Sequence, residues 1–195
     1  MCGIAGLFSF GAAAPPDKGE LARMIGALHH RGPDGSATFV DGPVGLAHAR
    51  LSIIDLATGW QPIANEDESL QVVFNGEIFN FVELRAGLER RGHRFRTHSD
   101  TEVIVHLYEE RGDDFVDELN GQFAIALWDR RRRRLVLARD RTGIRPLFYT
   151  RAGGRLAFAS EVKALFALPG VTRRLDVQGL ASTFSYWSVL PPGSV

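Results

Sequence analysis

Met1-Cys2-Gly3-Ile4-Ala5-Gly6-Leu7-Phe8 opens the chain and carries its single cysteine. The run is apolar on both faces, which predicts a buried β-strand over residues 2–10. Removal of Met1 would leave Cys2 with a thiol and a free α-amine on one residue. An α-amine titrates at roughly 7.7–8.0, so it can take the proton of a thiol, which ordinarily titrates at about 8.5. The stretch therefore fits a nucleophile at the start of a strand, and also a small buried cysteine with a structural role.

Composition places the chain among ordinary globular proteins. Hydrophobic residues make up 45% and charged residues 24%, with 23 basic and 23 acidic side chains among the 195 residues. This balance gives no net field that would favour nucleic acid or a membrane surface. A single cysteine cannot form an internal disulfide, and no apolar run approaches the ~20 residues of a membrane helix. With no secretory signal at its start, we expect a soluble cytoplasmic protein.

Hydrophobic periodicity predicts strands first, then helices, then strands again. Strands are expected over residues 2–10, 36–41, 44–50, 70–75, 123–129, 135–139, 147–150 and 156–160. Helices are expected over 21–28, from Phe81 to a stop at Gly92, after Ser99, over 161–166 and over 176–184. Ser99 with Glu102 has the spacing of a capping box. This order favours an α+β fold with antiparallel sheets over a doubly wound parallel sheet.

Polar residues near the predicted strand ends offer the groups that a thiol needs to cleave a carboxamide. Asn75 has a side-chain amide and Gly76 a backbone N–H unobstructed by a Cβ, at the point where the strand 70–75 is expected to break; such donors stabilise an oxyanion. Arg50 could hold an α-carboxylate with its forked guanidinium, and Asp100 and Glu77 could hold an α-ammonium. Each group has a structural alternative: a turn for Asn75-Gly76, a surface ion pair for Arg50, and helix capping for Asp100.

Two further clusters predict no site. His29, His30 and His48 are too scattered to argue for a metal site, and no cysteine or second histidine stands at ligand spacing from them. The arginine run over residues 130–134 lies between two predicted strands, which is typical of a solvated hairpin tip rather than a nucleic-acid site. We therefore expect no metal and no nucleic-acid partner.

Together these motifs resemble the class II glutamine amidotransferases of the N-terminal nucleophile hydrolase superfamily. More narrowly, the chain is similar to the N-terminal glutaminase domain of glutamine-dependent asparagine synthetases. The matching segments after the opening run are 30–35, 50–55, 61–62, 65–66, 75–80, 99–102, 121–124, 139–144, 146–149 and 158–165. The resemblance thus covers nearly the whole chain in order. Residues 50–53 and 61–62 favour the asparagine synthetase branch.

The resemblance implies a four-layer αββα sandwich of two antiparallel sheets and roles for particular residues. Cys2 would be the nucleophile with its freed amine as proton shuttle, and Asn75 and Gly76 would form the oxyanion hole. The residues implied to bind glutamine are Arg50 for its carboxylate, Glu77 and Asp100 for its amino group, and Ser52 and Ile53 through their backbone. No metal ion and no cofactor are implied for this domain.

The resemblance also implies a longer protein. Residues 1–190 would form the glutaminase domain, and residues 191–195 the start of a linker to an ATP-dependent synthetase domain that these residues do not contain. ATP and Mg²⁺ would serve that second domain, where ammonia would convert aspartate to asparagine. The expected partners are therefore glutamine and the synthetase domain, with no membrane partner and with homodimer formation left open.

Two alternatives remain at this point. An amidotransferase of the same architecture could act on another carboxylate in the synthesis of cell-surface or secondary metabolites. A catalytically inactive scaffold is the other, although Cys2, Arg50, Asn75, Gly76 and Asp100 are all intact. In either active case an uncleaved Met1 would keep the nitrogen of Cys2 in a peptide bond and abolish its basicity.

Overall fold

The computed structural model describes residues 1–189. The domain boundary predicted at residue 190 and the linker predicted over residues 191–195 lie outside the described residues. No helix within residues 1–189 combines the length and the apolar character needed to cross a membrane.

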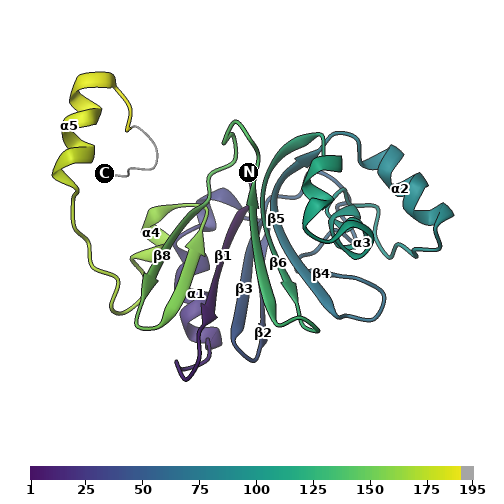
Figure 1. The fold of residues 1–195 in the computed structure, drawn as a ribbon, viewed down its shortest axis with the longest axis horizontal. Coiled ribbons are helices and arrows are strands. Elements are labelled where there is room, and N and C mark those ends of the chain that lie inside the picture. The colour runs from purple at the N-terminus through teal and green to yellow at the C-terminus, as the bar shows by residue number, and fades with distance from the viewer. Residues whose placement is uncertain (190–195) are drawn as a thin grey trace.

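Two antiparallel sheets form the centre of the molecule (Figure 1). The first sheet has the strand order β2 (Gly35–Asp41), β3 (Val44–Arg50), β1 (Gly3–Ser9), β9 (Arg155–Ala159) and β8 (Phe148–Ala152). The second has the order β4 (Ile63–Ala64), β5 (Leu70–Ile78), β6 (Gly121–Asp129) and β7 (Arg134–Arg139). Every strand pair in both sheets is antiparallel.

Helices cover the outer faces of the two sheets and complete four layers (Figure 1). Helices α1 (Lys18–Gly26) and α4 (Val162–Leu165) pack on the first sheet, and α2 (Phe81–Arg90) and α3 (Glu102–Arg111) pack on the second. The remaining helical segments are the 3₁₀ turns η1 (His29–Arg31) and η2 (Gly112–Glu118) and helix α5 (Val177–Tyr186). The predicted αββα sandwich is confirmed.

Strand alternation explains how one sequence supplies three apolar layers. In β1, Ile4 packs between the two sheets, whereas Ala5 and Leu7 pack beneath α1. Gly6 lies on the inner face, where the ring of Phe158 occupies the space that its side chain would need. The apolar run that predicted a strand buried on both faces is thereby accounted for.

Strand β5 differs from its prediction. It does not break at Gly76 but runs on to Ile78, which pairs with Gly121 of β6. A Cβ on Gly76 would lie 2.1 Å from the carbonyl oxygen of Gln122, so the glycine serves close packing of the neighbouring strand rather than a turn. The preceding region 53–68, for which no strand was predicted, contains the short strand β4.

The start of α3 also differs from its prediction. Its N-cap is Thr101, and no side chain caps the helix, so the capping box proposed for Ser99 and Glu102 is wrong. The carboxylate of Glu102 instead accepts from the backbone N–H groups of Arg96 and Thr97, each at 2.7 Å. An acidic side chain at this position therefore holds the irregular segment before the helix.

The arginine run does form the tip of the β6–β7 hairpin, as predicted. Arg131 to Arg134 are exposed, and Arg133 has the left-handed backbone of a turn with φ of 52°. Arg130 and Arg134 pair with Asp41 at 2.8 Å and Asp113 at 2.7 Å. Exposed ion pairs of this kind contribute little to stability.

We expect Gly6→Ala to lower the free energy of unfolding by about 1–3 kcal/mol, because overpacking a filled core forces backbone shifts. Its Cβ would lie 2.3 Å from the Phe158 ring and 2.5 Å from the carbonyl oxygen of Gly45. Urea unfolding followed by circular dichroism measures the change. Gly26→Ala, at a helical position with no atom within 4 Å of the new Cβ, is the matched control and should be neutral or slightly stabilising. Equal stability of both variants would contradict the packing described for Gly6.

Candidate functional site

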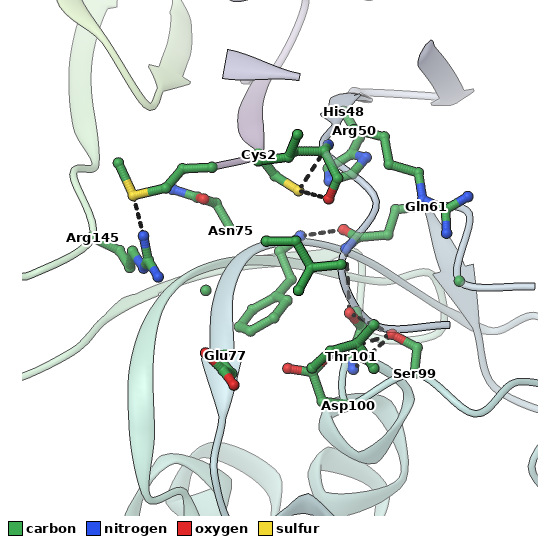
Figure 2. Close-up of a pocket in the computed structure, with 17 residues that line it drawn as sticks. Cys2, His48, Arg50, Gln61, Asn75, Glu77, Ser99, Asp100, Thr101 and Arg145 are labelled. Carbon is green, nitrogen blue, oxygen red and sulfur yellow. Dashed lines mark hydrogen bonds between the residues drawn. The ribbon is translucent and has the colours of Figure 1, made fainter. Parts of the chain in front are cut away.

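A pocket lies where the start of β1, the end of β3 and the outer edge of β5 meet (Figure 2). The residues predicted from the sequence that line it are Cys2, Arg50, Ile53, Asn75, Gly76, Glu77 and Asp100. Ser52 is the exception: it does not line the pocket, and its backbone N–H donates to the Asp34 carboxylate at 2.7 Å. The fold therefore brings together seven of the eight predicted residues.

The thiol of Cys2 lies against the loop that follows β3. The backbone N–H of Leu51 donates to Sγ at 3.4 Å, and the thiol faces the Leu51 carbonyl oxygen at 3.5 Å. The carbonyl of Cys2 accepts from Nε of Arg31 at 3.0 Å, and Nη1 of Arg31 pairs with Glu161 at 2.9 Å. Side chains from two distant segments thus fix the backbone of the cysteine.

Glu161 is the centre of that arrangement. Burial raises the pKa of its carboxyl group, but hydrogen bonds from Arg31, Lys163 and His30 outweigh burial and lower the pKa to about 2. The preceding residue, Ser160, accepts from the backbone N–H of Ile4 at 2.9 Å and so anchors the same strand. The short segment between β9 and α4 therefore positions the start of β1 through both a neutral and a charged contact.

The outer edge of β5 carries three backbone N–H groups beyond the reach of the short strand β4. Phe74 donates to the side-chain oxygen of Gln61 at 2.6 Å, and Ile78 donates to the carboxylate of Asp100 at 3.0 Å. Because alternate residues of a strand direct their N–H groups to the same edge, the N–H of Gly76 faces this edge between the other two. Among residues 1–189 no side chain accepts from Gly76, which lines the pocket.

Asn75 supplies a second unused donor. Its side chain is only 1% exposed, and its Nδ2 has no hydrogen-bond partner within the described part of the chain. Strand alternation puts it on the inner face of β5 with Val73, the face that packs toward β1. A buried amide without a partner is costly, by about 1–3 kcal/mol, so its position indicates an acceptor that arrives from the pocket.

Arg50 is the most strongly constrained charged group of the pocket. It is 2% exposed, and its Nη2 donates to the carbonyl oxygens of Asp55 at 2.6 Å and Leu56 at 3.3 Å. Its guanidinium carbon lies 4.6 Å from the ring centre of Trp60. Its Nη1 is buried and has no partner among residues 1–189. A guanidinium held in this way presents one free N–H face to an incoming carboxylate.

The loop that holds Arg50 is itself fixed by Asp55. This residue has a φ of 51°, and its carboxylate accepts from the backbone N–H groups of Thr58 at 2.9 Å and His98 at 2.7 Å. Slight burial raises the pKa of Asp55, but these hydrogen bonds and the Thr58 hydroxyl lower it to about 2. The loop is thus tied to the segment that carries Asp100.

Asp100 and Glu77 provide negative charge at the end of the pocket opposite Arg50 (Figure 2). Burial raises the pKa of Asp100 most strongly, and the charge of Glu77 raises it further, although the N–H of Ile78 and the Ser99 hydroxyl oppose this. Asp100 does not cap α3, so the helix-capping alternative is wrong. A cation placed here would relieve the destabilised carboxylate.

His48 and Arg145 also line the pocket, although the sequence predicted no role in it for either residue. His48 on β3 is 1% exposed, and burial, together with the charge of Arg50, lowers its pKa to about 3, so the imidazole is neutral. Arg145 reaches the pocket beside the sulfur of Met1. Its loop is held by Asp140, which accepts from the N–H groups of Ile144 at 2.8 Å and Arg145 at 2.9 Å. The matching segments 139–144 and 146–149 flank Arg145, and this position is the signal in the sequence that would have pointed to it.

Comparisons with known proteins show the family to which the chain is related. The family model "Glutamine amidotransferase domain" matches residues 1–195. Glutamine-hydrolyzing asparagine synthetases 2 and 3 of Bacillus subtilis (strain 168) are 48% and 41% identical over 90% and 100% of this chain, which covers 24% and 32% of them. The rice (Oryza sativa subsp. japonica) asparagine synthetase 2 is 44% identical over 85% of this chain and is covered to 28%. The chain thus spans about a quarter to a third of the length of these relatives.

Solved structures confirm the fold at lower sequence identity. A glutamine phosphoribosylpyrophosphate amidotransferase from B. subtilis, complexed with ADP and GMP, matches with a TM-score of 0.71 at 23% identity. The match covers 89% of this chain and 45% of the other. A second structure, an allosteric regulatory enzyme of purine biosynthesis, gives a TM-score of 0.72, also at 23% identity.

We expect Glu161→Gln to remove an acid-dependent part of the stability. Because the folded pKa lies near 2 and the unfolded value is 4.5, the ionised Glu161 stabilises the native state above pH 4.5, and this contribution is lost as the pH falls toward 2. Allowing for its partial exposure, the loss is about 1 kcal/mol. Urea unfolding at several pH values measures it, with Glu89→Gln from the surface pair with Arg85 as the control for removing a carboxylate. If the free energy of unfolding of Glu161→Gln fell with acid pH as steeply as that of the wild type, the ionised Glu161 would not stabilise the segment that holds Cys2.

Proposed function

Since the chain belongs to the family of glutamine amidotransferase domains, we propose that it hydrolyses glutamine to glutamate and ammonia through a thioester on Cys2. The observation that supports this most directly is a pair of buried donors, Asn75 Nδ2 and Arg50 Nη1, which have no partner among residues 1–189 and share one pocket with the thiol. One donor suits a developing oxyanion and the other a carboxylate. Glutamine carries both acceptors.

The first step requires removal of Met1. The freed α-amine of Cys2 takes the thiol proton, and Sγ adds to the side-chain carbonyl carbon of glutamine. The negative oxygen that forms is bound by Asn75 Nδ2 and the Gly76 N–H. Collapse of the intermediate breaks the carbon–nitrogen bond, and the ammonium of Cys2 returns its proton to the departing nitrogen, which leaves as ammonia.

The second step regenerates the thiol. The same amine takes a proton from a water molecule, which adds to the thioester carbon through a second oxyanion. Breaking the carbon–sulfur bond releases glutamate, and the sulfur recovers a proton from the amine. The sum is one water consumed for each ammonia and glutamate formed. The chemistry needs no metal ion or cofactor, and His48 is too weak a base to replace the amine.

Substrate recognition divides between the two charged ends of the pocket. The α-carboxylate of glutamine would pair with Nη1 of Arg50, whose other nitrogen is already engaged by backbone carbonyls. Its α-ammonium would lie near Asp100 and Glu77, where a positive charge would stabilise the ionised form of Asp100. Ile53 contributes to the rim of the pocket, whereas Ser52 supports the loop through Asp34.

We further propose that the ammonia is used in a larger protein. The relatives are named glutamine-hydrolyzing asparagine synthetases and are three to four times longer than the part matched here. The acceptor would then be the β-carboxyl of aspartate, activated with ATP and Mg²⁺ in a synthetase domain. A different carboxylate as acceptor is the second candidate, because the residues of this pocket account for the binding of glutamine and do not distinguish between acceptors. Cytoplasmic location and dimer formation stay predictions.

We expect Cys2→Ala to abolish glutaminase activity, since no other thiol is present. A form that retains residues before Cys2 should also be inactive, because its nitrogen would stay an amide. Ammonia release from glutamine measures both. Intact mass shows whether Met1 is absent from the active protein. Ammonia release by either variant would contradict the mechanism. A wild-type protein that lacks Met1 and still releases no ammonia would also contradict it, and would favour a catalytically inactive scaffold.

We expect Asn75→Ala to lower kcat by about 10²–10³, with a much smaller change in KM, because the donor acts on the oxyanion. Steady-state ammonia release measures both constants. Asn80→Ala is the matched control: this asparagine lies just beyond β5, and its side-chain bonds go to Glu118 and Asn120 rather than into the pocket. A similar kcat in the two variants would remove Asn75 from the proposed oxyanion hole.

A further inference from the structure

Two histidines and two glutamates converge outside the Cys2 pocket. The ligand atoms of Glu66, His93, His106 and Glu109 all lie within 4.8 Å of one another, and none of the four lines the pocket. Glu66 comes from the segment between β4 and β5, His93 follows α2, and the other two lie on one face of α3. We propose that these four residues form a structural binding site for one Zn²⁺ ion.

The distances between the ligand atoms fit a tetrahedral ion. Zinc binds nitrogen and oxygen at about 2.0–2.2 Å, which makes the edges of the coordination tetrahedron about 3.3–3.6 Å. Nδ1 of His93 lies 3.4 Å from Glu66 Oε1 and 3.7 Å from Glu109 Oε2. Nδ1 of His106 lies 3.4 Å from Glu66 Oε2 and 3.3 Å from Glu109 Oε2. These four separations lie close to tetrahedral edge lengths, with Glu66 offering one oxygen to each ring, and the other ligand separations are within 4.8 Å.

A carboxylate outside the cluster orients the imidazole ring of His93. Nε2 of His93 lies 3.1 Å from Glu110, and Nε2 of His106 lies 3.7 Å from Glu102. A ring that donates its Nε2–H outward keeps the Nδ1 lone pair directed inward. This carboxylate–histidine arrangement is the one that supports metal-bound histidines. It occurs here at His93, whereas Nε2 of His106 is too far from Glu102 for a hydrogen bond and makes only an ion-pair contact.

The two glutamates are oriented in the same way. Glu66 Oε1 accepts from the backbone N–H of Arg94 at 2.8 Å, and Glu109 Oε1 accepts from Nδ2 of Asn65 at 2.9 Å. Two carboxylates and two neutral imidazoles balance the charge of a divalent cation. With four protein ligands there is no open position for a substrate, so the site is structural.

A proton is the competing occupant of the cluster. His106 is fully buried, which lowers its pKa, but Glu102, Glu109 and Glu66 outweigh burial and raise it to about 9. An imidazolium would therefore also satisfy these carboxylates. A protonated His106 does not explain why His93 also directs its Nδ1 toward Glu66 and Glu109, because one imidazolium alone would satisfy these two carboxylates.

The position of the site indicates what the ion stabilises. It would join the segment between β4 and β5 and the segment after α2 to the body of α3. The first of these segments follows Gln61, and the second leads to Asp100; their side chains occupy the edge N–H groups of β5 on either side of Gly76. An ion here would hold the wall of the pocket without touching the substrate.

The test is zinc binding by the purified protein after removal of metals with a chelator and dialysis. Calorimetric titration with ZnCl₂ should give one equivalent bound per chain, and Co²⁺ should give the intense visible spectrum of a tetrahedral site. Glu109→Gln and His93→Gln, both at the solvent-accessible side, should weaken zinc binding at least about 100-fold. Glu110→Gln should weaken it about tenfold through His93. His29→Gln, an exposed histidine on η1, is the matched control and should bind like the wild type.

Two results would overturn the proposal. Absence of stoichiometric binding by the wild type would leave a proton as the occupant. Equal affinity in the wild type and Glu109→Gln would mean that zinc binds scattered surface groups only. A fall in the melting temperature on chelation, seen in the wild type and absent from Glu109→Gln, would support the structural role independently of glutaminase activity.

Discussion

The outer edge of β5 sets the constraint on which the site depends. Strand β4 is only two residues long and pairs with Gln71 and Val72, so the backbone N–H groups further along β5 need other acceptors. Buried backbone donors are almost always satisfied, and here a glutamine and an aspartate from separate loops satisfy two of them. The N–H of Gly76 is left between them, at the point where Asn75 also has a free donor. A short edge strand thus creates a place for a substrate oxygen.

The nucleophile is brought to this edge by contacts from the other sheet. Cys2 precedes β1, and its carbonyl is held by Arg31 and indirectly by Glu161, which lies far along the chain. The end of β3 supplies the guanidinium of Arg50, and the loop that follows supplies the backbone against Sγ. Because each anchor is itself buried or ion-paired, the geometry exists before substrate arrives. Preorganised donors of this kind cost no reorganisation during the reaction.

Much of the fold could be predicted from the sequence because buried strands and helices show their apolar residues as continuous runs or at regular spacing. The opening run and the segments over 36–41 and 44–50 are examples. Gly76 was misjudged because a glycine that permits close packing of a neighbouring strand has the same local signal as one that permits a turn. The capping box failed since Glu102 serves the preceding loop.

For the site, residue chemistry and the family resemblance identified the groups around Cys2. The places of His48 and Arg145 in the pocket were not predicted, because they depend on strand pairing and on a loop held by Asp140. The histidines at 93 and 106 were missed for a related reason: they come from different elements and meet only after α2 packs beside α3. Spacing in a sequence reports ligands on one element, whereas this cluster is assembled by tertiary structure.

The most direct test of the account is a crystal structure of the Cys2→Ala protein with L-glutamine bound. The proposed mechanism predicts that the α-carboxylate of glutamine lies on Arg50 Nη1 and its α-ammonium beside Asp100. Its side-chain carbonyl oxygen should lie within hydrogen-bond distance of both Asn75 Nδ2 and the Gly76 N–H. Glutamine bound elsewhere, or bound in this pocket with its side-chain oxygen away from both donors, would contradict it.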